Sequence, residues 1–480
     1  MSNIWNTIIG LEVHIQLNTK SKLFSGAPNK FGGTANSQTS LIDLGYPGTL
    51  PVINEEAITM AIKLGIALNG NIPEQTVFAR KNYFYPDLPK GYQISQFDKP
   101  IISGGFLLIE TGDQEKKINL TRAHLEEDAG KSIHIPNQRL TGLDLNRAGT
   151  PLIEVVSEPE MKDAQEAVSF MKNLRELVRH LEICDGNMQE GSFRCDANIS
   201  VKRNTDNKLG TKVEIKNLNS FKFVENAINF EISRQINRLE NKEKIIQETR
   251  LYDEKTGETK TMRTKEDEND YRYFPDPDLL PVEIDINKLN LIKNTAIELP
   301  LNKRKRYATE LGLNQTQIDT LLADPALTSF FEKSIANAAL PPKLAANWIT
   351  GEIMKYLKEA NITISQIKID VKSFIKILKL IETNECTQND GKRILQMIWE
   401  DEILIEEAIN KTLSGKEKFN DENLSKIVNK VLDDHSKQVE QYLAGKKKVF
   451  GFLVGQVMNL SSGKADPKRV NRLIKDRLNQ

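Results

Sequence analysis

Hydrophobic and polar residues alternate along several short runs in the first part of the chain, as they do in half-buried β-strands. In GLEVHIQL at residues 10–17, the aliphatic side chains fall on one face, and Glu12 and His14 fall on the other. The aliphatic face is suited to packing into a core. The polar face is then left free for chemistry.

The same arrangement returns in four later runs, each with charged residues at alternate positions. They are Arg122, His124 and Glu126 in NLTRAHLEED, Glu154 in PLIEVV, Arg194 and Asp196 in FRCDANISV, and Lys212, Glu214 and Lys216 in TKVEIKN. Carboxylates on neighbouring strands repel one another unless a cation lies between them. Oxygen ligands with one imidazole suit Mg2+ or Mn2+. We therefore predict a divalent-metal and phosphate site, with ion pairing among the same side chains as the alternative.

Apolar residues at helical spacing predict three helices in the same part of the chain, over 54–69, 159–182 and 218–240. The second is expected to carry Pro159 in its first turn. Strands and helices interleave without a βαβ rhythm, which indicates the α+β class. After about residue 295 the strand signals stop and prolines separate helical segments. We predict an α+β domain at 1–295, a helical domain at 296–404 and a small helical domain at 405–480.

The charge of the chain is balanced overall but not locally. The 66 Lys and Arg equal the 66 Asp and Glu, so no global field indicates a nucleic-acid partner. Residues 437–480, however, hold ten Lys or Arg against three Asp or Glu, a formal +7. Candidate phosphate contacts in this basic end are Lys446, Lys447, Lys448, Lys464, Lys468 and Arg469. A basic terminal helix that is simply solvated is the alternative.

The cysteines and the hydropathy of the chain indicate the cellular compartment in which the protein is expected. The three cysteines, Cys184, Cys195 and Cys386, form no CxxC pair, which fits a reducing environment. There is no basic leader and no run of about 18 apolar residues. We expect a cytoplasmic protein without a membrane partner.

Basic and aromatic residues interleave in RKNYFYPDLPKGYQISQ at 80–96, with Arg80 as a candidate cofactor-binding residue. Such interleaving suits a nucleotide or an RNA end, and an aromatic loop packed under the sheet explains it equally well. A P-loop is excluded, because Leu125 stands where the motif ending at Gly130-Lys131-Ser132 requires a glycine. The chain also lacks the local motifs of nucleophilic hydrolases.

These runs, read together and in order, closely resemble the GatB family, the B subunits of the bacterial and organellar glutamyl-tRNA(Gln)/aspartyl-tRNA(Asn) amidotransferases. The matching segments include GLEVHIQL at 10–17, RKNYFYPDLPKGYQISQFD at 80–98, HLEEDAGKS at 124–132, DLNRAGTPLIEVVSEP at 144–159, EGSFRCDANISV at 190–201, GTKVEIKNLNSFKFV at 210–224 and DYRYFPDPDLLP at 270–281. The basic end resembles the family's tRNA-binding domain.

The resemblance implies a glutamine-synthetase-like cradle with a mixed or antiparallel sheet. It implies that ATP phosphorylates the side-chain carboxylate of Glu-tRNA(Gln), Asp-tRNA(Asn) or both, and that ammonia then displaces the phosphate. The implied partners in a heterotrimer are an amidase (glutaminase) that releases ammonia from glutamine, called the A subunit, and a small C subunit. The tRNA is the third implied partner. The rival hypothesis is a non-catalytic scaffold that only binds tRNA.

The family's metal positions, carried over one at a time, fall on the strand acids already singled out. They are Glu12, His14, Glu126 or Glu127, Glu154, Asp196 and Glu214. Arg122, Arg194, Lys212 and Lys216, which share faces with these acids, are the candidates for neutralising phosphate charge, together with Arg80. Strand parity favours Glu126 over Glu127. Many members also bind zinc through four cysteines, and here those positions read Ser25, Ala27, Ser40 and Asp43, so we expect no structural zinc.

Overall fold

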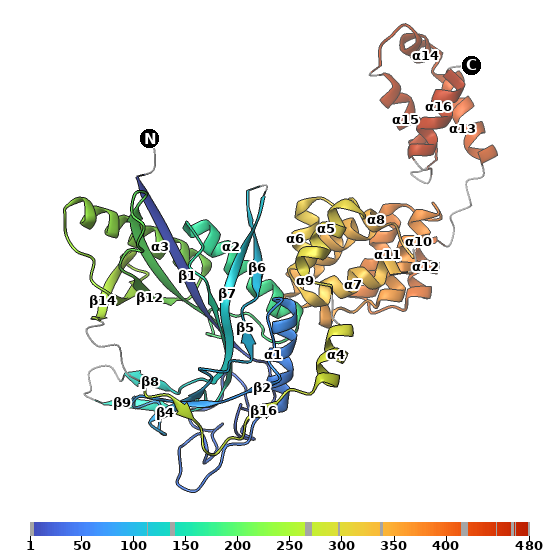
Figure 1. Ribbon diagram of the computed structural model, residues 1–480. Coiled ribbons are helices and arrows are strands. Elements are labelled where there is room, and N and C mark those ends of the chain that lie inside the picture. Colours follow the sequence, from blue (N-terminus) through green and yellow to red (C-terminus); the bar gives the residue numbers. More distant parts are fainter. Residues whose placement is uncertain are drawn as a thin grey trace. The chain divides into compact units, whose positions relative to one another are not determined.

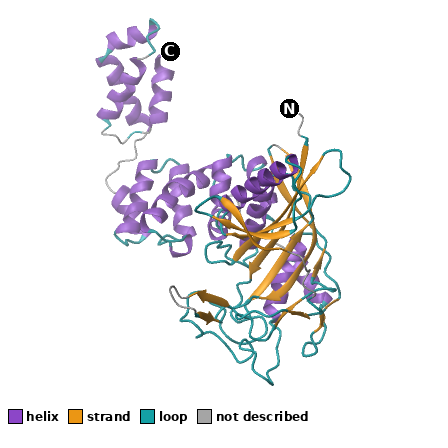
Figure 2. Cartoon of the chain, turned by 90° about the vertical axis from the view of Figure 1, so that its left-hand side faces the viewer, coloured by secondary structure: helices purple, strands orange, loops and turns teal. Residues whose placement is uncertain are grey.

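The computed structural model describes residues 4–112, 114–134, 140–264, 271–295, 298–336, 339–413, 421–447, 449–461, 465 and 467–478. The chain divides into two compact units, Met1–Arg306 with Leu322–Pro325, and Tyr307–Leu321 with Ala326–Gln480. All strands of the described chain, orange in Figure 2, belong to the first unit, and the described elements of the second unit are helical. The predicted α+β class is therefore confirmed. The predicted division into three domains stays a prediction.

A nine-stranded sheet organises the first unit (Figure 1). Its order is β14-β13-β12-β11-β1-β10-β7-β5, and β6 also pairs with β7. The strands are β1 (Trp5–Gln16), β5 (Ile102–Ser103), β6 (Phe106–Thr111), β7 (Gln114–Glu127), β10 (Pro151–Ser157), β11 (Phe193–Arg203), β12 (Val213–Leu218), β13 (Glu248–Asp253) and β14 (Glu258–Thr264). All neighbours are antiparallel except β12 and β13, which are parallel, so the sheet is mixed.

The two faces of this sheet differ as the sequence alternation predicts. On β1, Leu11, Val13 and Ile15 are almost fully buried, whereas Glu12 and His14 are only half-buried. Helices α2 (Ala164–His180) and α3 (Phe221–Glu240) cover the aliphatic face, α2 on β6 and α3 on β11 and β12 (Figure 1). The hydrophobic core lies between these helices and the sheet, and the polar face is turned away from it.

The three predicted helices are present, with one boundary error. Helix α1 spans Glu55–Ala67, and α3 begins after Ser220, whose side chain accepts from the N–H of Phe223. Helix α2 begins at Ala164 and not at Pro159. Asp163 is its N-cap, and the segment after Pro159 is extended, since Met161 forms a bridge with Ile9 of β1.

Three small sheets complete the first unit. Strands β3 (Ala79–Asn82), β4 (Tyr92–Ser95) and β15 (Phe274–Pro275) form one of them. The others pair β2 (Gln75–Thr76) with β16 (Val282–Glu283), and β8 (Lys131–His134) with β9 (Thr141–Asp144). The β3–β4 pair brings part of the basic and aromatic segment next to β7, on the polar face of the main sheet.

After β16 every element of the described chain is helical. The helices are α4 (Ile286–Asn294), α5 (Pro300–Thr309), α6 (Gln315–Leu322), α7 (Pro325–Ile335), α8 (Pro342–Trp348), α9 (Met354–Ala360), α10 (Val371–Glu382), α11 (Gln388–Glu400), α12 (Ile405–Leu413), α13 (Asp421–Asp434), α14 (Ser436–Leu443), α15 (Val449–Leu460) and α16 (Pro467–Leu478), with a π-helical turn at Ile349–Ile353 and a 3-10 turn at Ile364–Gln366. Helix α12 packs on α11, whereas α13, α15 and α16 bury a hydrophobic cluster together. None of the described helices is both long and apolar enough to cross a membrane.

A buried ion pair occupies the loop where the resemblance implied cysteines in other family members. Lys22 has no exposed surface, and its Nζ lies 3.1 Å from Oδ2 of Asp43. Ser25 Oγ donates to the same carboxylate at 3.1 Å, and the N–H of Ser40 donates to it at 2.8 Å. Three of the four positions thus form a hydrogen-bonded cluster around one carboxylate.

Removing the acid of this pair should destabilise the first unit strongly. Asp43→Ala leaves the Lys22 ammonium buried without its counter-ion, a loss of about 3–5 kcal/mol. Chemical denaturation of the full chain should show the transition of the first unit at lower denaturant. The double variant Lys22→Met/Asp43→Leu should recover most of the loss because no charge stays buried. An Asp43→Ala transition equal to that of the unchanged chain would contradict the expectation.

Candidate metal and phosphate site

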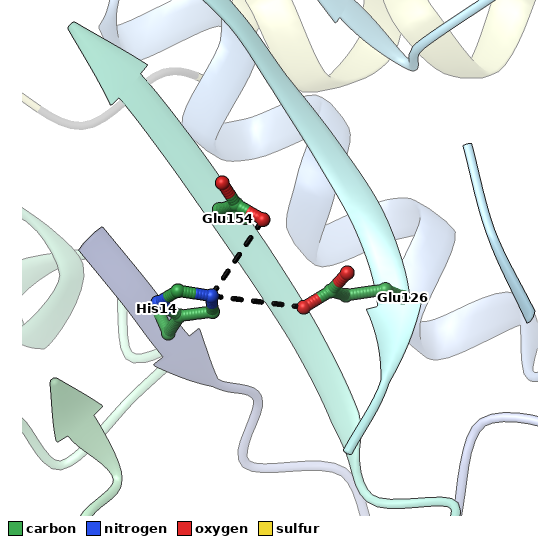
Figure 3. A group of neighbouring side chains, drawn as sticks. All are labelled: His14, Glu126 and Glu154. Carbon is green, nitrogen blue, oxygen red and sulfur yellow. Dashed lines mark ion pairs between the residues drawn. The ribbon is translucent and has the colours of Figure 1, made fainter. Parts of the chain in front are cut away.

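Two groups of potential metal ligands lie on the polar face of the main sheet. The first contains His14, Glu126 and Glu154, from β1, β7 and β10. In Figure 3 one ring nitrogen of His14 points toward both carboxylates. This Nε2 atom lies 3.8 Å from Oε1 of Glu126 and 3.6 Å from Oε2 of Glu154. The second contains Glu12, Asp196 and Glu214, from β1, β11 and β12. In each group one ligand atom from every residue lies within 4.8 Å of the others.

Strand register explains why residues so far apart in sequence meet. Glu12 pairs with Asp196 across β1 and β11, and His14 pairs with Glu154 across β1 and β10. Paired residues project from the same face of a sheet, so the alternation of each strand brings its charged residues to one side. Glu12 and His14 are two residues apart on β1. The two groups are therefore neighbours.

The pKa values of Glu12 and Glu126 are shifted in opposite directions by their surroundings. Burial raises the pKa of Glu12, and the nearby charges of Glu154, Glu214 and Asp196 raise it further. For Glu126 burial acts in the same direction, but the His124 imidazole, with help from Lys81 and His14, outweighs it and lowers the pKa of this carboxyl. A divalent cation at either group would favour the charged carboxylates.

Four of the five predicted phosphate-binding bases reach the same face. Lys216 forms ion pairs with both Asp196 and Glu214, and those acids raise its pKa despite its burial. Arg122 and Lys212 line the cavity that contains Glu12. Arg194 reaches the neighbouring cavity and donates to Asp128 at 2.8 Å.

Two cavities open on this face, and several of their lining residues are the same. One is about 430 Å³ and is lined by residues of the first group together with Asp128 and Arg194. The other is about 280 Å³ and is lined by residues of both groups together with Arg122 and Lys212. His14, Lys81, Glu154, Asp196 and Lys216 line both. The two acid groups therefore face one continuous cleft.

Two predicted residues are not brought to the cleft. Glu127 forms an ion pair with Lys90 and accepts from the N–H of Ile94 at 2.9 Å, so its carboxylate belongs to neither acid group. Strand parity thus selects the glutamate that faces the cleft, Glu126. Arg80 pairs with Asp276 and Asp278, each at 2.9 Å, which occupies its guanidinium outside the cleft lining.

Three residues with close contacts in the site were not among the predicted metal ligands or phosphate-binding bases. Lys81, the neighbour of Arg80, lines both cavities, and although burial favours its neutral form, Glu126, Tyr273 and Glu154 raise its pKa. Because adjacent residues of a strand point to opposite faces, alternation indicated that only one of Arg80 and Lys81 could face the cleft. The sequence did not show which of the two it was.

His124 and Asp128 are the other two. The Nε2 atom of His124 lies 3.4 Å from Glu154 and 3.7 Å from Glu126, which ties the two carboxylates of the first group together. Asp128 holds Arg194 and accepts from Gln16 at 3.0 Å, and these partners lower its pKa although burial opposes them. His124 shares the parity of Arg122 and Glu126, so alternation also pointed to it.

The predicted basic end lies in the second unit. Lys446 and Lys447 are exposed after α14, and Arg469 is exposed on α16. Lys448 and Lys464 lie outside the described residues, as does the side chain of Lys468. Their role in binding tRNA stays a prediction.

The donor set fits Mg2+ or Mn2+. Carboxylate oxygens dominate, one imidazole is added, and no thiolate is present in either group. Among the described residues, Nδ1 of His124 and Nε of Arg122 are also buried without a hydrogen-bond partner, and both side chains line the cavity that contains Glu12. Within the protein, the acids of the first group lie close to histidine nitrogens, whereas in the second group Lys216 contacts two of the three carboxylates.

Comparison with known proteins adds an independent result. Residues 7–290 match the model of the GatB/GatE catalytic domain, and residues 329–478 match that of the GatB domain. The B subunit of the aspartyl/glutamyl-tRNA(Asn/Gln) amidotransferase of Thioalkalivibrio sulfidiphilus is 51% identical over 476 residues, which cover 99% of each chain. The B subunits of the same description from Alkalilimnicola ehrlichii and Coxiella burnetii are each 49% identical over 99% of this chain and 99% and 100% of their own.

The acid-bearing mixed sheet of the first unit therefore defines a catalytic domain of the GatB/GatE class. The matches extend over nearly the whole chain and include both family models. The chain belongs to the GatB family, the B subunits of aspartyl/glutamyl-tRNA(Asn/Gln) amidotransferases.

Divalent cations should stabilise the first unit through the two acid groups. A ligand at 100 times its dissociation constant stabilises the folded state by about 2.7 kcal/mol. Thermal denaturation of the full chain should thus shift upward when Mn2+ is added and return when EDTA is added. The double variant Glu12→Gln/Glu154→Gln should lose the shift, whereas Glu110→Gln, exposed on β6, should keep it. An undiminished shift in the double variant would place the cation elsewhere.

Proposed function

We propose that this chain uses ATP to phosphorylate the side-chain carboxylate of misacylated Glu-tRNA(Gln), Asp-tRNA(Asn) or both. Ammonia from a partner glutaminase then converts the product to Gln-tRNA(Gln) or Asn-tRNA(Asn). The observation that carries the proposal is the pair of acid groups facing one cleft. The proposed enzyme class is a ligase that forms a carbon–nitrogen bond. This class follows from the amidotransferase subunits to which the chain is similar.

The chemistry proceeds in two displacements. An oxygen of the aminoacyl carboxylate attacks the γ-phosphorus of ATP, the bond from that phosphorus to the bridging oxygen breaks, and ADP leaves. The ammonia nitrogen then attacks the carbonyl carbon of the acyl phosphate, the carbon–oxygen bond to phosphate breaks, and nitrogen loses a proton. Phosphorylation is needed because the unmodified carboxylate would have to expel oxide or hydroxide.

Residues of the cleft are suited to both displacements. Lys81, Arg122 and Lys212 supply positive charge where the triphosphate and the substrate carboxylate would meet. Held by the two acid groups, Mg2+ or Mn2+ would neutralise phosphate charge and favour an in-line attack. Lys216 contacts the carboxylates of both Asp196 and Glu214 in the lining of the cleft.

The remaining features of the proposal come from the family. The chain would act in the cytoplasm as part of a heterotrimer with an amidase and a small third protein, the A and C subunits, on a glutamine-synthetase-like cradle. The sequence has none of the local motifs of a nucleophilic amide hydrolase, which agrees with a separate source of ammonia. The basic end of the second unit would bind the tRNA.

A non-catalytic scaffold is the competing function. A scaffold would bind tRNA through its basic end, but it has no use for acids clustered so closely that their charges add to the effect of burial and raise the pKa of Glu12. The clustered acids therefore favour the catalytic function.

Neutralising one acid from each group should separate the two functions. In the reconstituted complex with ATP and misacylated tRNA, Glu12→Gln or Glu154→Gln should slow ADP formation on the order of 100-fold or more, since even hydrogen-bond partners of metal ligands contribute 10- to 100-fold. Filter binding of tRNA should be unchanged in both. Glu110→Gln serves as the matched control on the same sheet. Full activity of both cleft variants would favour the scaffold.

The basic end is tested by charge reversal in the second unit. Lys446→Glu/Lys447→Glu should weaken tRNA binding and reduce its dependence on salt, by about one unit of log–log slope for each phosphate contact that is removed. Lys355→Glu/Lys358→Glu makes the same charge change on α9 and should have a smaller effect. Deletion of residues 414–480 removes α13–α16 but spares α12, which packs on α11. Equal tRNA affinity in all variants would remove this segment from the proposal.

A further inference from the structure

Behind the second acid group, the hydroxyl of Thr249 on β13 holds one of its members. Thr249 has no exposed surface, and its Oγ1 donates to Oε2 of Glu214 at 2.7 Å. The two residues are direct partners in the parallel pairing of β12 with β13. The hydrogen bond is therefore set by the register of the sheet.

The two oxygens of Glu214 have different donors. Oε1 lies 3.3 Å from Nζ of Lys216, and Oε2 takes the hydrogen bond from Thr249. A carboxylate held at both oxygens has one preferred orientation about its terminal torsion. Lysine is a flexible point charge with a long side chain, whereas the threonine hydroxyl is short and fully buried. Thr249 is thus the more rigid of the two contacts.

The strand that carries Thr249 is anchored on its other face. Its neighbours Glu248 and Arg250 form an ion pair at 2.7 Å and join a buried network with Glu231 and Arg234 of α3. Because side chains alternate along β13, Glu248 and Arg250 point toward this network and Thr249 points toward the acid group. The network lies on the face opposite Thr249, and the position of the Thr249 hydroxyl follows from the pairing of β13 with β12.

We propose that Thr249 is a positioning residue for the divalent cation held by Glu12, Asp196 and Glu214. The inference rests on the proposed function and adds a residue that supports one of the two acid groups selectively. The group of His14, Glu126 and Glu154 is built on β1, β7 and β10, and β13 pairs with none of these strands. Loss of the hydroxyl should thus affect the two groups unequally.

Direct binding of Mn2+ to the full chain tests this role without an activity assay. Free Mn2+ is followed by its EPR signal during titration, in the unchanged chain and in a Glu154→Gln background that disables the other group. Thr249→Val keeps the side-chain shape but removes the donor, and it should weaken binding at the second group by about 10- to 100-fold. Thr249→Ser keeps the hydroxyl and should bind Mn2+ nearly as the unchanged chain does.

Thr261 provides the matched control. Its hydroxyl lies in the same hairpin and bonds to Glu248 and Arg250, away from the acid group. Thr261→Val should leave Mn2+ affinity unchanged if Thr249 acts by orienting Glu214. Equal weakening in both valine variants, or none in Thr249→Val, would overturn the positioning role. An unchanged chain that binds no Mn2+ would instead overturn the metal site of the proposed function, and this inference with it.

Discussion

Repulsion among carboxylates on one face of a sheet is the constraint on which the first unit depends. Two unit charges within 4.8 Å of each other interact by roughly 3–4 kcal/mol at an effective dielectric constant near 20. Strand register places three such acids together at the second group, where one lysine contacts two of them. The core on the opposite face offsets this repulsion, because aliphatic residues of the same strands are buried there against α2 and α3. Along the same strands, the aliphatic residues thus stabilise the fold, and the alternate charged residues line the cleft.

Much of the site was predictable because alternation is a local property. The positions of Glu12, His14, Glu126, Glu154, Asp196 and Glu214 followed from parity within each run and from the family resemblance, and the structure brings all six to one cleft. Pairing among strands was not predictable, since β1 lies between β10 and β11, which come far later in the sequence. For the same reason the sequence did not show that the acids divide into two groups.

Two predicted site residues that lie away from the cleft, and the misplaced start of one helix, depend on distant partners. Arg80 and Lys81 are adjacent, so one must point away from the cleft, and Asp276 and Asp278 near β15 decide which. Glu127 ends β7 against Lys90, a contact between segments whose pairing the sequence does not reveal. The start of α2 was misplaced because the bridge from Met161 to Ile9 keeps the preceding segment extended. In each case tertiary contact overrides a local preference.

The loop around Lys22 and Asp43 shows a different use of charge. Where the family resemblance implied a cluster of thiolates in other members, this chain closes the loop with a lysine, an aspartate and two serines. None of these four side chains is a thiol, so the cluster that closes the loop offers no sulfur for an oxidant to attack.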